Sequence, residues 1–359
     1  MRILYANVIE MNAGWGIECF LSPALVEFGH QVSNVDYRKN RHRIARTFWP
    51  LRAHDAFFIN KGDGFPLSVL RNIRCPRFLW CCDLLALRMG QPEDELDPVY
   101  DRTQYRLLRS GWFDHIFVRT QHCLETVLAN EWIGPEHCSI LSSACEPSFH
   151  RPLAGTQKDI DILFIGTLTP RRERVVSELS AAYPVTSVSA FGEQMVQYVN
   201  RAKIVLNIHQ GHLPDMENRV HEALGCGSFL MTERLTPENP FSESELVEFD
   251  TTKDLVEKVG YYLAHPDERE AIAEQGRLAV LAGHTFVDRA EQIISTLSDY
   301  VHESCSPDAP VLRRNADVIR CAISEEITRQ KILAWHRLHR NPDAAPSSQK
   351  SRRGTVIER

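Results

Sequence analysis

Short apolar runs alternate with polar loops and helical patterns along most of the chain. In the first 150 residues the helical patterns include 17–28 and 103–110, and the apolar runs fall at 3–8, 31–35, 56–60, 77–82 and 115–118. Buried strands that alternate with helices predict a parallel sheet covered by helices on both faces.

The segment 146–158 interrupts this rhythm, because it contains Pro and Gly and lacks periodicity. It is typical of a linker. Strand and helix patterns then resume, with apolar runs at 161–166, 185–190, 204–208, 228–232 and 246–249, and helical patterns at 172–183, 193–201, 218–224, 253–264 and 266–282. We therefore predict two α/β domains, one over 1–150 and one over 151–300.

The pattern changes again after residue 300. Residues 306–310 break the chain, and Ile319, Ile323 and Ile327 then recur at four-residue spacing. This spacing predicts one helix with an apolar stripe inside a helical extension over 301–340. The last stretch, 341–359, is polar and contains proline, which predicts disorder.

Length and charge agree with this division. The chain has 359 residues, whereas a single core rarely grows past roughly 250–300 residues. The net charge is -6, but residues 311–359 hold eleven Lys/Arg and five Asp/Glu, a balance of +6, so the rest carries -12. A basic tail can bind an acidic surface, although a solvated tail is the more ordinary interpretation.

Membrane, secretion and disulfide signals are weak in this sequence. No apolar run approaches the roughly 20 residues that cross a bilayer. The first ten residues read as a strand rather than a signal peptide. Ten cysteines occur without any CxxC pair, which predicts reduced thiols in a cytoplasmic protein.

The strongest candidate for chemistry is the segment 215–227, DMENRVHEALGCG. Asn218 can cap a short helix, and Arg219 and Glu222 share one face of it because they are three residues apart. Free N–H groups at the helix start suit a diphosphate, and a carboxylate one turn later suits a ribose diol. An ordinary Arg219–Glu222 pair on a solvated face explains the spacing equally well.

A second candidate follows the apolar run DILFIG. Gly166 lets the backbone approach a ligand, Thr169 can cap the next helix, and Arg171, Arg172 and Arg174 crowd its first turn. Cations oppose the helix dipole at that position, and a bound anion would resolve the conflict. The alternative is that all three arginines point into solvent.

The N-terminal half offers weaker candidates. Gly14 and Gly16 lie between the first strand and helix, but no third glycine completes a dinucleotide-binding fingerprint. Lys61 and Asp63 follow a strand and could contact a substrate, or could simply form a turn. Asp83 also follows a strand, so it is a candidate general base.

Two histidines and a pair of aspartates in the C-terminal half are further candidates. His209 and His212 follow the run IVLNI, so either could act as a base, although most such residues are ordinary loop residues. The pair Asp159 and Asp161 has the letters of a metal-binding D-x-D motif. Because it precedes a strand instead of ending one, we do not predict a metal site there.

The order and spacing of these segments resemble those of GT-B glycosyltransferases, specifically the CgeB-like group. The resemblance rests on FIGTLTPRRERVV, YVNRAKIVLNIH, ENRVHEALGCGSFLMTE and the helical stretch that begins YYLAHPDERE, in that order. It implies an α/β GT-B fold, with two Rossmann-like domains whose parallel sheets face a central cleft. The C-terminal helix and tail lie outside it.

The resemblance also implies roles for particular residues. Glu222 matches the glutamate that holds the donor ribose, and Arg219 faces the donor on the same helix. Gly166 and Arg172 match the loop that meets the diphosphate. No metal or cofactor is implied beyond the nucleotide-sugar co-substrate, since helix dipole and cations offset the leaving charge.

The resemblance extends to the acceptor side, but one motif departs from the family's pattern. Gly14 and Gly16 match the glycine loop of the N-terminal domain. Related retaining enzymes carry a second glutamate eight residues before the ribose glutamate, where this chain has Pro214. Asp215 and Glu217 are near but out of register, so stereochemistry and sugar remain open.

The leading hypothesis is metal-independent transfer of a sugar from a nucleotide-diphosphate sugar to an unidentified acceptor. The acceptor could be a glycan, a protein or a small molecule, and nucleic acid is not expected. Two alternatives stay open: a catalytically silent binding module of the same fold, and a sugar-nucleotide epimerase. A dinucleotide oxidoreductase is disfavoured because the fingerprint is absent.

Overall fold

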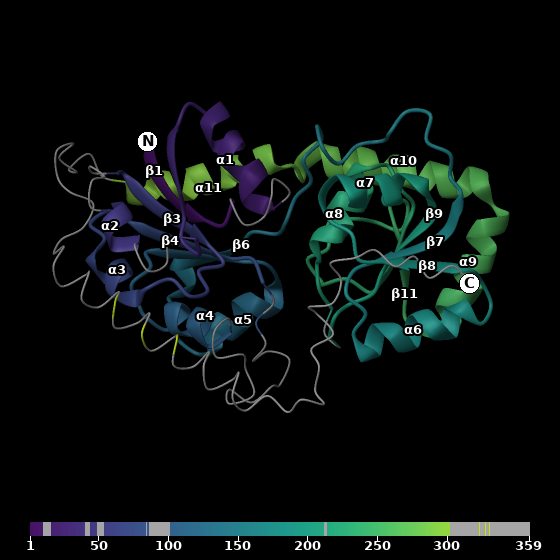
Figure 1. The fold of residues 1–359 in the computed structure, drawn as a ribbon, viewed down its shortest axis with the longest axis horizontal. Helices are drawn as coiled ribbons and strands as arrows, with labels where there is room; N and C mark the ends of the chain where they lie inside the picture. Colours follow the sequence, from purple (N-terminus) through teal and green to yellow (C-terminus); the bar gives the residue numbers. More distant parts are fainter. Residues whose placement is uncertain are drawn as a thin grey trace.

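The computed structural model describes residues 1–9, 16–39, 44–48, 54–83, 85, 101–211, 214–301 and the single positions 323, 327 and 330. Two parallel sheets lie side by side in it, one in each half of the chain (Figure 1). The predicted α/β architecture of two separate sheets is confirmed. No helix among the described residues is long and apolar enough to span a membrane.

The N-terminal sheet has six parallel strands in the order β2-β1-β3-β4-β5-β6. Its strands are β1 (Arg2–Asn7), β2 (Gln31–Asp36), β3 (Ala56–Asn60), β4 (Arg77–Cys81), β5 (His115–Val118) and β6 (Cys138–Ile140). The helices between them are α1 (Ile17–Glu27), α2 (Ile44–Phe48), α3 (Leu67–Asn72), α4 (Asp101–Leu108), α5 (Gln121–Ala129) and the short η3 (Pro135–His137). Strand β6 was not predicted, because the polar Ser139 interrupts its short apolar stretch.

The C-terminal sheet has five parallel strands in the order β11-β10-β9-β7-β8. Its strands are β7 (Ile160–Ile165), β8 (Val185–Val188), β9 (Ala202–Asn207), β10 (Leu230–Glu233) and β11 (Val247–Phe249). The helices are α6 (Pro170–Ser180), α7 (Gly192–Arg201), α8 (Asn218–Gly225), α9 (Thr252–Ala264), α10 (Pro266–Gly283) and α11 (Phe286–Tyr300).

Each sheet buries both faces because successive side chains of a strand point in opposite directions. In β1, Leu4 joins the core under α3 and α5, whereas Tyr5 joins the core under α1. In β7, Leu163 packs with α7 and α8, and Phe164 packs with α6 and α9. The near-continuous apolar runs of the sequence follow from this double burial.

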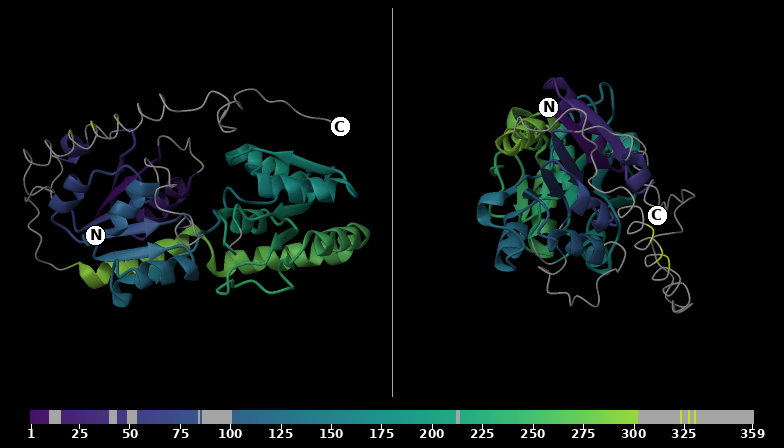
Figure 2. Two further views of the ribbon diagram at one scale, coloured as in Figure 1. Left: turned by 90° about the horizontal axis from the view of Figure 1, so that it is seen from below. Right: turned by 90° about the vertical axis from the view of Figure 1, so that its left-hand side faces the viewer.

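Helix α11 returns to the N-terminal domain. Its apolar residues Phe286, Ala290, Ile293 and Leu297 belong to the same core as α1. Figures 1 and 2 show α10 and α11 running one after the other along one side of both domains. The range 151–300, predicted as the second domain, therefore ends in a helix that packs on the first.

Two stretches of chain cross between the domains next to each other. Cys145 donates its backbone N–H to the His284 carbonyl at 3.0 Å, and the Phe286 N–H donates to the Cys145 carbonyl at 3.1 Å. The buried Arg289 donates to the Ser142 carbonyl at 2.9 Å. We call this pair of connections the crossover.

The extension and tail lie almost entirely outside the described residues. Ile323, Ile327 and Gln330 are helical, as the four-residue spacing predicts, and Ile323 and Ile327 are 49% and 51% exposed. Among the described cysteines, eight are free thiols and all but Cys19 are buried, as predicted.

Candidate functional site

The loops that follow β7 and β9 meet the first turn of α8 at the carboxyl edge of the C-terminal sheet. Gly166 directly follows β7 and has a φ of +143°, and a Cβ built there would lie 2.7 Å from Arg219 Nη2. Only glycine therefore lets the Arg219 guanidinium lie against this backbone. The structure thus brings Gly166 and Arg219 together, and the sequence predicts that both face the same donor.

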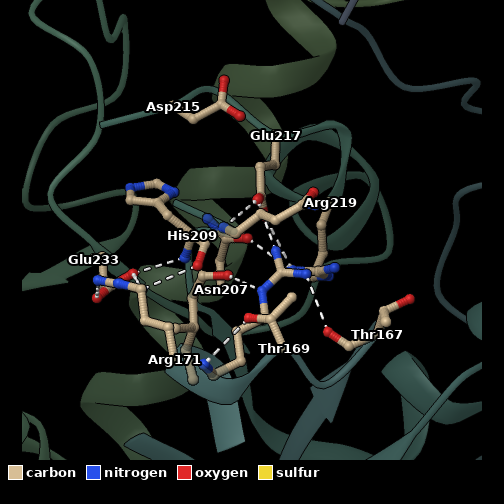
Figure 3. Close-up of polar contacts among 12 residues, drawn as sticks. Thr167, Thr169, Arg171, Asn207, His209, Asp215, Glu217, Arg219 and Glu233 are labelled. Carbon is tan, nitrogen blue, oxygen red and sulfur yellow. Dashed lines mark hydrogen bonds and ion pairs between the residues drawn. The ribbon is translucent and has the colours of Figure 1, made fainter. Parts of the chain in front are cut away.

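Glu217 organises this edge by pairing with two arginines. Its Oε1 lies 2.8 Å from Arg172 Nη2, and its Oε2 lies 3.2 Å from Arg219 Nη1. Arg219 Nη1 also donates to Asn207 Oδ1 at 2.8 Å (Figure 3). Both guanidinium groups lie over the Phe164 ring, at 5.7 and 5.6 Å from its centroid, so cation–π attraction adds to the ion pairs.

Arg172 is a buried residue, not a solvent-facing one. Its Nε donates to the Ile208 carbonyl at 2.8 Å and its Nη1 donates to the Thr167 carbonyl at 3.3 Å. Burial lowers the pKa of this guanidinium, and Glu217 counteracts that effect. Arg172 thus fixes the two loops that frame the site, whereas Arg174 is exposed.

Arg171 and His209 share a second carboxylate, Glu233. Arg171 contacts Glu233 Oε2 at 3.0 Å and Oε1 at 2.5 Å, and the His209 backbone N–H donates to Oε2 at 2.6 Å (Figure 3). His209 Nε2 lies 3.0 Å from the Arg234 carbonyl, so that nitrogen carries the proton. His209 Nδ1 is buried without a partner.

Helix α8 starts one residue earlier than an Asn218 cap requires. Glu217 is the N-cap residue and makes no side-chain capping bond. The predicted Asn218 cap is therefore wrong. Asn218 is already helical, and its Oδ1 is buried without a partner. The first-turn N–H groups of α8 consequently lack a side-chain cap.

Glu222 lies one turn further along α8. Burial raises the pKa of its carboxyl to about 7, although Arg219 acts in the opposite direction. Arg219 pairs with Glu217 instead, so the intrahelical Arg219–Glu222 ion pair does not form. Within the described residues the Glu222 carboxylate has neither an ion pair nor a hydrogen bond, which leaves both oxygens available as acceptors.

The N-terminal domain presents a cation and a carboxylate at its own carboxyl edge. Lys61 follows β3 and Asp83 follows β4, with Nζ 3.7 Å from Oδ1. Asp83 raises the pKa of Lys61. The Lys61 backbone has a φ of 60°, an uncommon conformation for a side-chain-bearing residue that often marks a functional loop.

The other N-terminal candidates have different surroundings. Asp63 is buried and accepts two hydrogen bonds from Arg38 Nη2, at 2.6 and 2.8 Å, which tie it into its own domain. Gly16 is the N-cap residue of α1. Gly14 and His212 lie outside the described residues.

Comparisons with known proteins show similarity to one family in the C-terminal half of the chain. Residues 149–295 match the model of a family described as glycosyl transferase-like. A stretch of 106 residues is 28% identical to the spore protein CgeB of Bacillus subtilis strain 168, and it covers 26% of this chain and 32% of CgeB. The match thus spans about a third of that relative's length.

Solved structures share the fold over most of the chain. Sucrose-phosphate synthase from Thermosynechococcus elongatus has a TM-score of 0.60 at 12% identity, over 83% of this chain and 98% of that one. Anabaena HepE in complex with UDP and glucose has a TM-score of 0.60 at 11% identity, over 83% of this chain and 100% of that one.

The C-terminal half of the chain is therefore similar to glycosyl transferase-like proteins, and the chain as a whole has the GT-B fold. The predicted GT-B fold is confirmed, and the family match falls on the domain that carries Gly166, Arg219 and Glu222.

Several residues at this edge of the sheet were not singled out from sequence. Glu233 ends β10 and Asn207 ends β9, so position at a strand's carboxyl end is the signal that could have found them. Glu217 gave no signal beyond its place before α8.

Arg119 is the most consequential of the missed residues. It directly follows β5, and its Nη2 lies 2.5 Å from Asp215 Oδ2 in the other domain. Nearby, the Gln121 backbone N–H at the start of α5 donates to Glu238 Oε1 at 2.7 Å. The two domains therefore touch through an ion pair and a hydrogen bond at their carboxyl edges.

The D-x-D letters have an ordinary structural explanation. Asp159 pairs with Arg201 at 2.7 Å, and Asp161 pairs with Lys203 at 2.6 Å. Among the described residues no group of three or more His, Cys, Asp or Glu side chains is arranged to hold a metal ion.

Proposed function

We propose that this protein is a glycosyltransferase that moves a sugar from a nucleoside-diphosphate sugar to a hydroxyl-bearing acceptor, without a metal ion. The observation that carries the proposal is the donor-side geometry around α8. The Arg219 side chain, from the uncapped first turn of α8, lies against the Gly166 backbone, and the unpaired Glu222 carboxylate follows one turn later on the same helix.

The diphosphate would lie against Gly166 and the first turn of α8. Helix N–H groups and the positive end of the helix dipole attract an anion there. Arg219 supplies a fixed cation, because Asn207 and Glu217 hold its guanidinium in place. These groups would offset the charge that develops on the leaving diphosphate, which is the task of a metal in other transferases.

The sequence predicts that Arg171 and Arg172 bind the diphosphate directly, but their contacts favour another role. Both are engaged by carboxylates and loop carbonyls. We assign them as positioning residues that fix the loops after β7 and β9, and not as direct diphosphate ligands.

Glu222 would accept hydrogen bonds from the ribose hydroxyls. A pKa of about 7 means that roughly half of the carboxyls are ionised at neutral pH. A ribose diol donates better to the ionised form, so donor binding would draw Glu222 toward ionisation. Similarity to HepE in complex with UDP and glucose makes UDP the first nucleotide to test.

The N-terminal domain would supply the acceptor side. Asp83 is the stronger candidate base for the acceptor hydroxyl, because its side chain is 48% exposed and Lys61 lies beside it as a counter-ion. His209 is 4% exposed, and its Nε2 donates to the Arg234 carbonyl. This arrangement favours a role in fixing the loop after β9.

Isothermal titration with UDP, GDP, ADP and dTDP tests the donor site. We expect one nucleotide to bind wild-type protein and to bind Glu222→Ala at least about tenfold more weakly, the loss expected for a pair of hydrogen bonds to a carboxylate. Glu257→Ala on exposed α9, whose partner is Lys253, is the matched control. Wild-type protein that binds none of the four nucleotides would contradict the proposal.

Product analysis then separates the alternatives. Incubation with the matching nucleotide sugar and candidate acceptors should give a glycosylated product in a transferase. Formation of an isomeric nucleotide sugar without acceptor would identify an epimerase. Tight binding with no product in either assay would support the silent binding module.

A further inference from the structure

The domains of this protein are joined at two different places. At the crossover they are linked covalently and by Arg289. At the carboxyl edges they meet through the Arg119–Asp215 ion pair and the Gln121–Glu238 hydrogen bond. A covalent connection on one side can act as a hinge between the domains. A polar contact on the other side can then form and break as the domains close and open.

We propose that Arg119, Asp215 and Glu238 form a reversible clasp that closes the two domains over the donor, and that they are positioning residues for sugar transfer. This inference rests on the proposed function. Arg119 and the first turn of α5 belong to the N-terminal domain, while Asp215 and Glu238 belong to loops of the C-terminal domain.

The ion pair is buried, which makes it strong in attraction and costly in desolvation. The side chains of Arg119 and Asp215 are only 12% and 7% exposed. Removing such charges from water offsets much of their mutual attraction, so a buried pair contributes little net stability. A contact near this balance can open and close with small changes in free energy.

Unsatisfied atoms point to the same conclusion. Arg119 Nε, Asp215 Oδ1 and Glu238 Oε2 are each buried without a hydrogen-bond partner. A permanent interface would satisfy these groups or replace them with apolar ones, because each orphaned polar atom costs free energy. Opening the domains would return all three atoms to water.

The hydrogen bond between Gln121 and Glu238 supports the closed arrangement of the domains. Glu238 places a carboxylate at the start of α5, where the positive end of the helix dipole favours it. Arg119 is close enough to Asp83 in the N-terminal domain for the Asp83 charge to raise the pKa of its guanidinium, and Asp215 lies three residues before α8. Closure therefore brings the candidate base toward the helix that would hold the donor.

The mechanistic consequence is a separation between binding and transfer. Gly166, Arg219 and Glu222 all belong to the C-terminal domain, so the donor can bind without the clasp. Transfer needs both domains, because the acceptor side and the water-excluding closure come from the N-terminal one.

Small-angle scattering of the full chain tests closure directly. Arg119→Gln, Asp215→Asn and Glu238→Gln remove one charge each at nearly constant volume. We expect each variant to show a larger radius of gyration than wild type, and Asp215→Asn/Glu238→Gln the largest. Asp250→Asn removes a carboxylate that pairs with Arg234 at 2.9 Å within one domain, and it should leave the scattering unchanged.

Kinetics provide the second readout. We expect kcat to fall about tenfold or more in the clasp variants while the donor KM changes less than about threefold, because misplacement affects the reacting geometry. The combined effect of Arg119→Gln and Asp215→Asn should equal either single effect, since both break one pair. Circular dichroism and Tm exclude a folding defect, and Glu238→Gln provides a milder variant.

Two results would overturn the clasp: scattering profiles that coincide with wild type in all three folded variants, or kcat losses that add fully between Arg119→Gln and Asp215→Asn. Failure of the proposed function looks different. In that case the wild-type protein binds no nucleotide, while scattering still decides whether the domains open.

Discussion

The position of the Arg219 side chain requires a glycine at residue 166. The Gly166 φ of +143° and the Arg219 Nη2 atom 2.7 Å from any added Cβ both oppose substitution. We expect Gly166→Ala to weaken nucleotide binding by tenfold or more and to lower the free energy of unfolding by about 1–2 kcal/mol, the cost of a strained backbone. Titration calorimetry and urea unfolding measure the two effects. Gly155 also has a positive φ, +76°, but open space around it, so unchanged binding in Gly155→Ala with reduced binding in Gly166→Ala isolates the contact with Arg219.

Glu222 predicts a pH dependence of stability. Its folded-state pKa of about 7 lies above the unfolded value of 4.5, so the folded protein binds more protons between these two values. Raising pH through this window therefore lowers the free energy of unfolding. Urea unfolding from pH 4.5 to 7.5 should show a shallower decline in Glu222→Gln than in wild type. Parallel curves for the two proteins would show that Glu222 is not the titrating group.

At the scale of elements, Glu217 links the loop after β7 to the start of α8. It pairs with the buried Arg172 and with Arg219. We expect Glu217→Gln to lower the free energy of unfolding by about 2–4 kcal/mol, because it leaves a buried guanidinium without its counter-charge. Nucleotide affinity should fall as well, since Arg219 loses one of its two anchors. Glu257→Gln, on the exposed face of α9, should change neither quantity.

Much of the fold was predictable at this scale. Apolar runs located the strands of both sheets apart from β6, because strands buried on both faces leave continuous apolar stretches. Helix α8 was predicted over 218–224 and ends one residue later, at Gly225. Its cap was misassigned, because Asn218 has the side chain of a cap but Glu217 has the extended backbone of one.

The candidate site was only partly predictable. Gly166, Arg219 and Glu222 could be placed together because they follow strands or share a helix face. The partners that decide their roles could not be placed so easily. Glu217 and Glu233 engage the arginines that looked free in the sequence, and Asp215 finds its partner 96 residues away in the other domain. Pairings at such separation depend on the domain arrangement, which local patterns do not contain.

At the scale of the whole molecule, Arg289 holds the crossover. Its Nε donates to the carbonyls of Ser142 and Ser143, at 2.9 and 3.2 Å, and its Nη1 donates to the Gly283 carbonyl at 3.2 Å. These bonds join the chain that leaves the N-terminal domain to the chain that returns to it. Because α11 supplies part of the N-terminal core, the two domains should lose stability together when this joint is intact.

Arg289→Met keeps the length of the side chain and removes its donors, so it leaves several carbonyls at the crossover without partners. We expect a loss of about 2–4 kcal/mol for a buried charge-assisted network, together with a change in cooperativity. Differential scanning calorimetry should show one transition in wild type and two partly separated transitions in the variant, because the domains would no longer unfold as one unit. Arg201→Met, which breaks an exposed pair with Asp159, should keep a single transition. A single, merely shifted transition in Arg289→Met would mean that core packing of α11, and not the arginine, couples the domains.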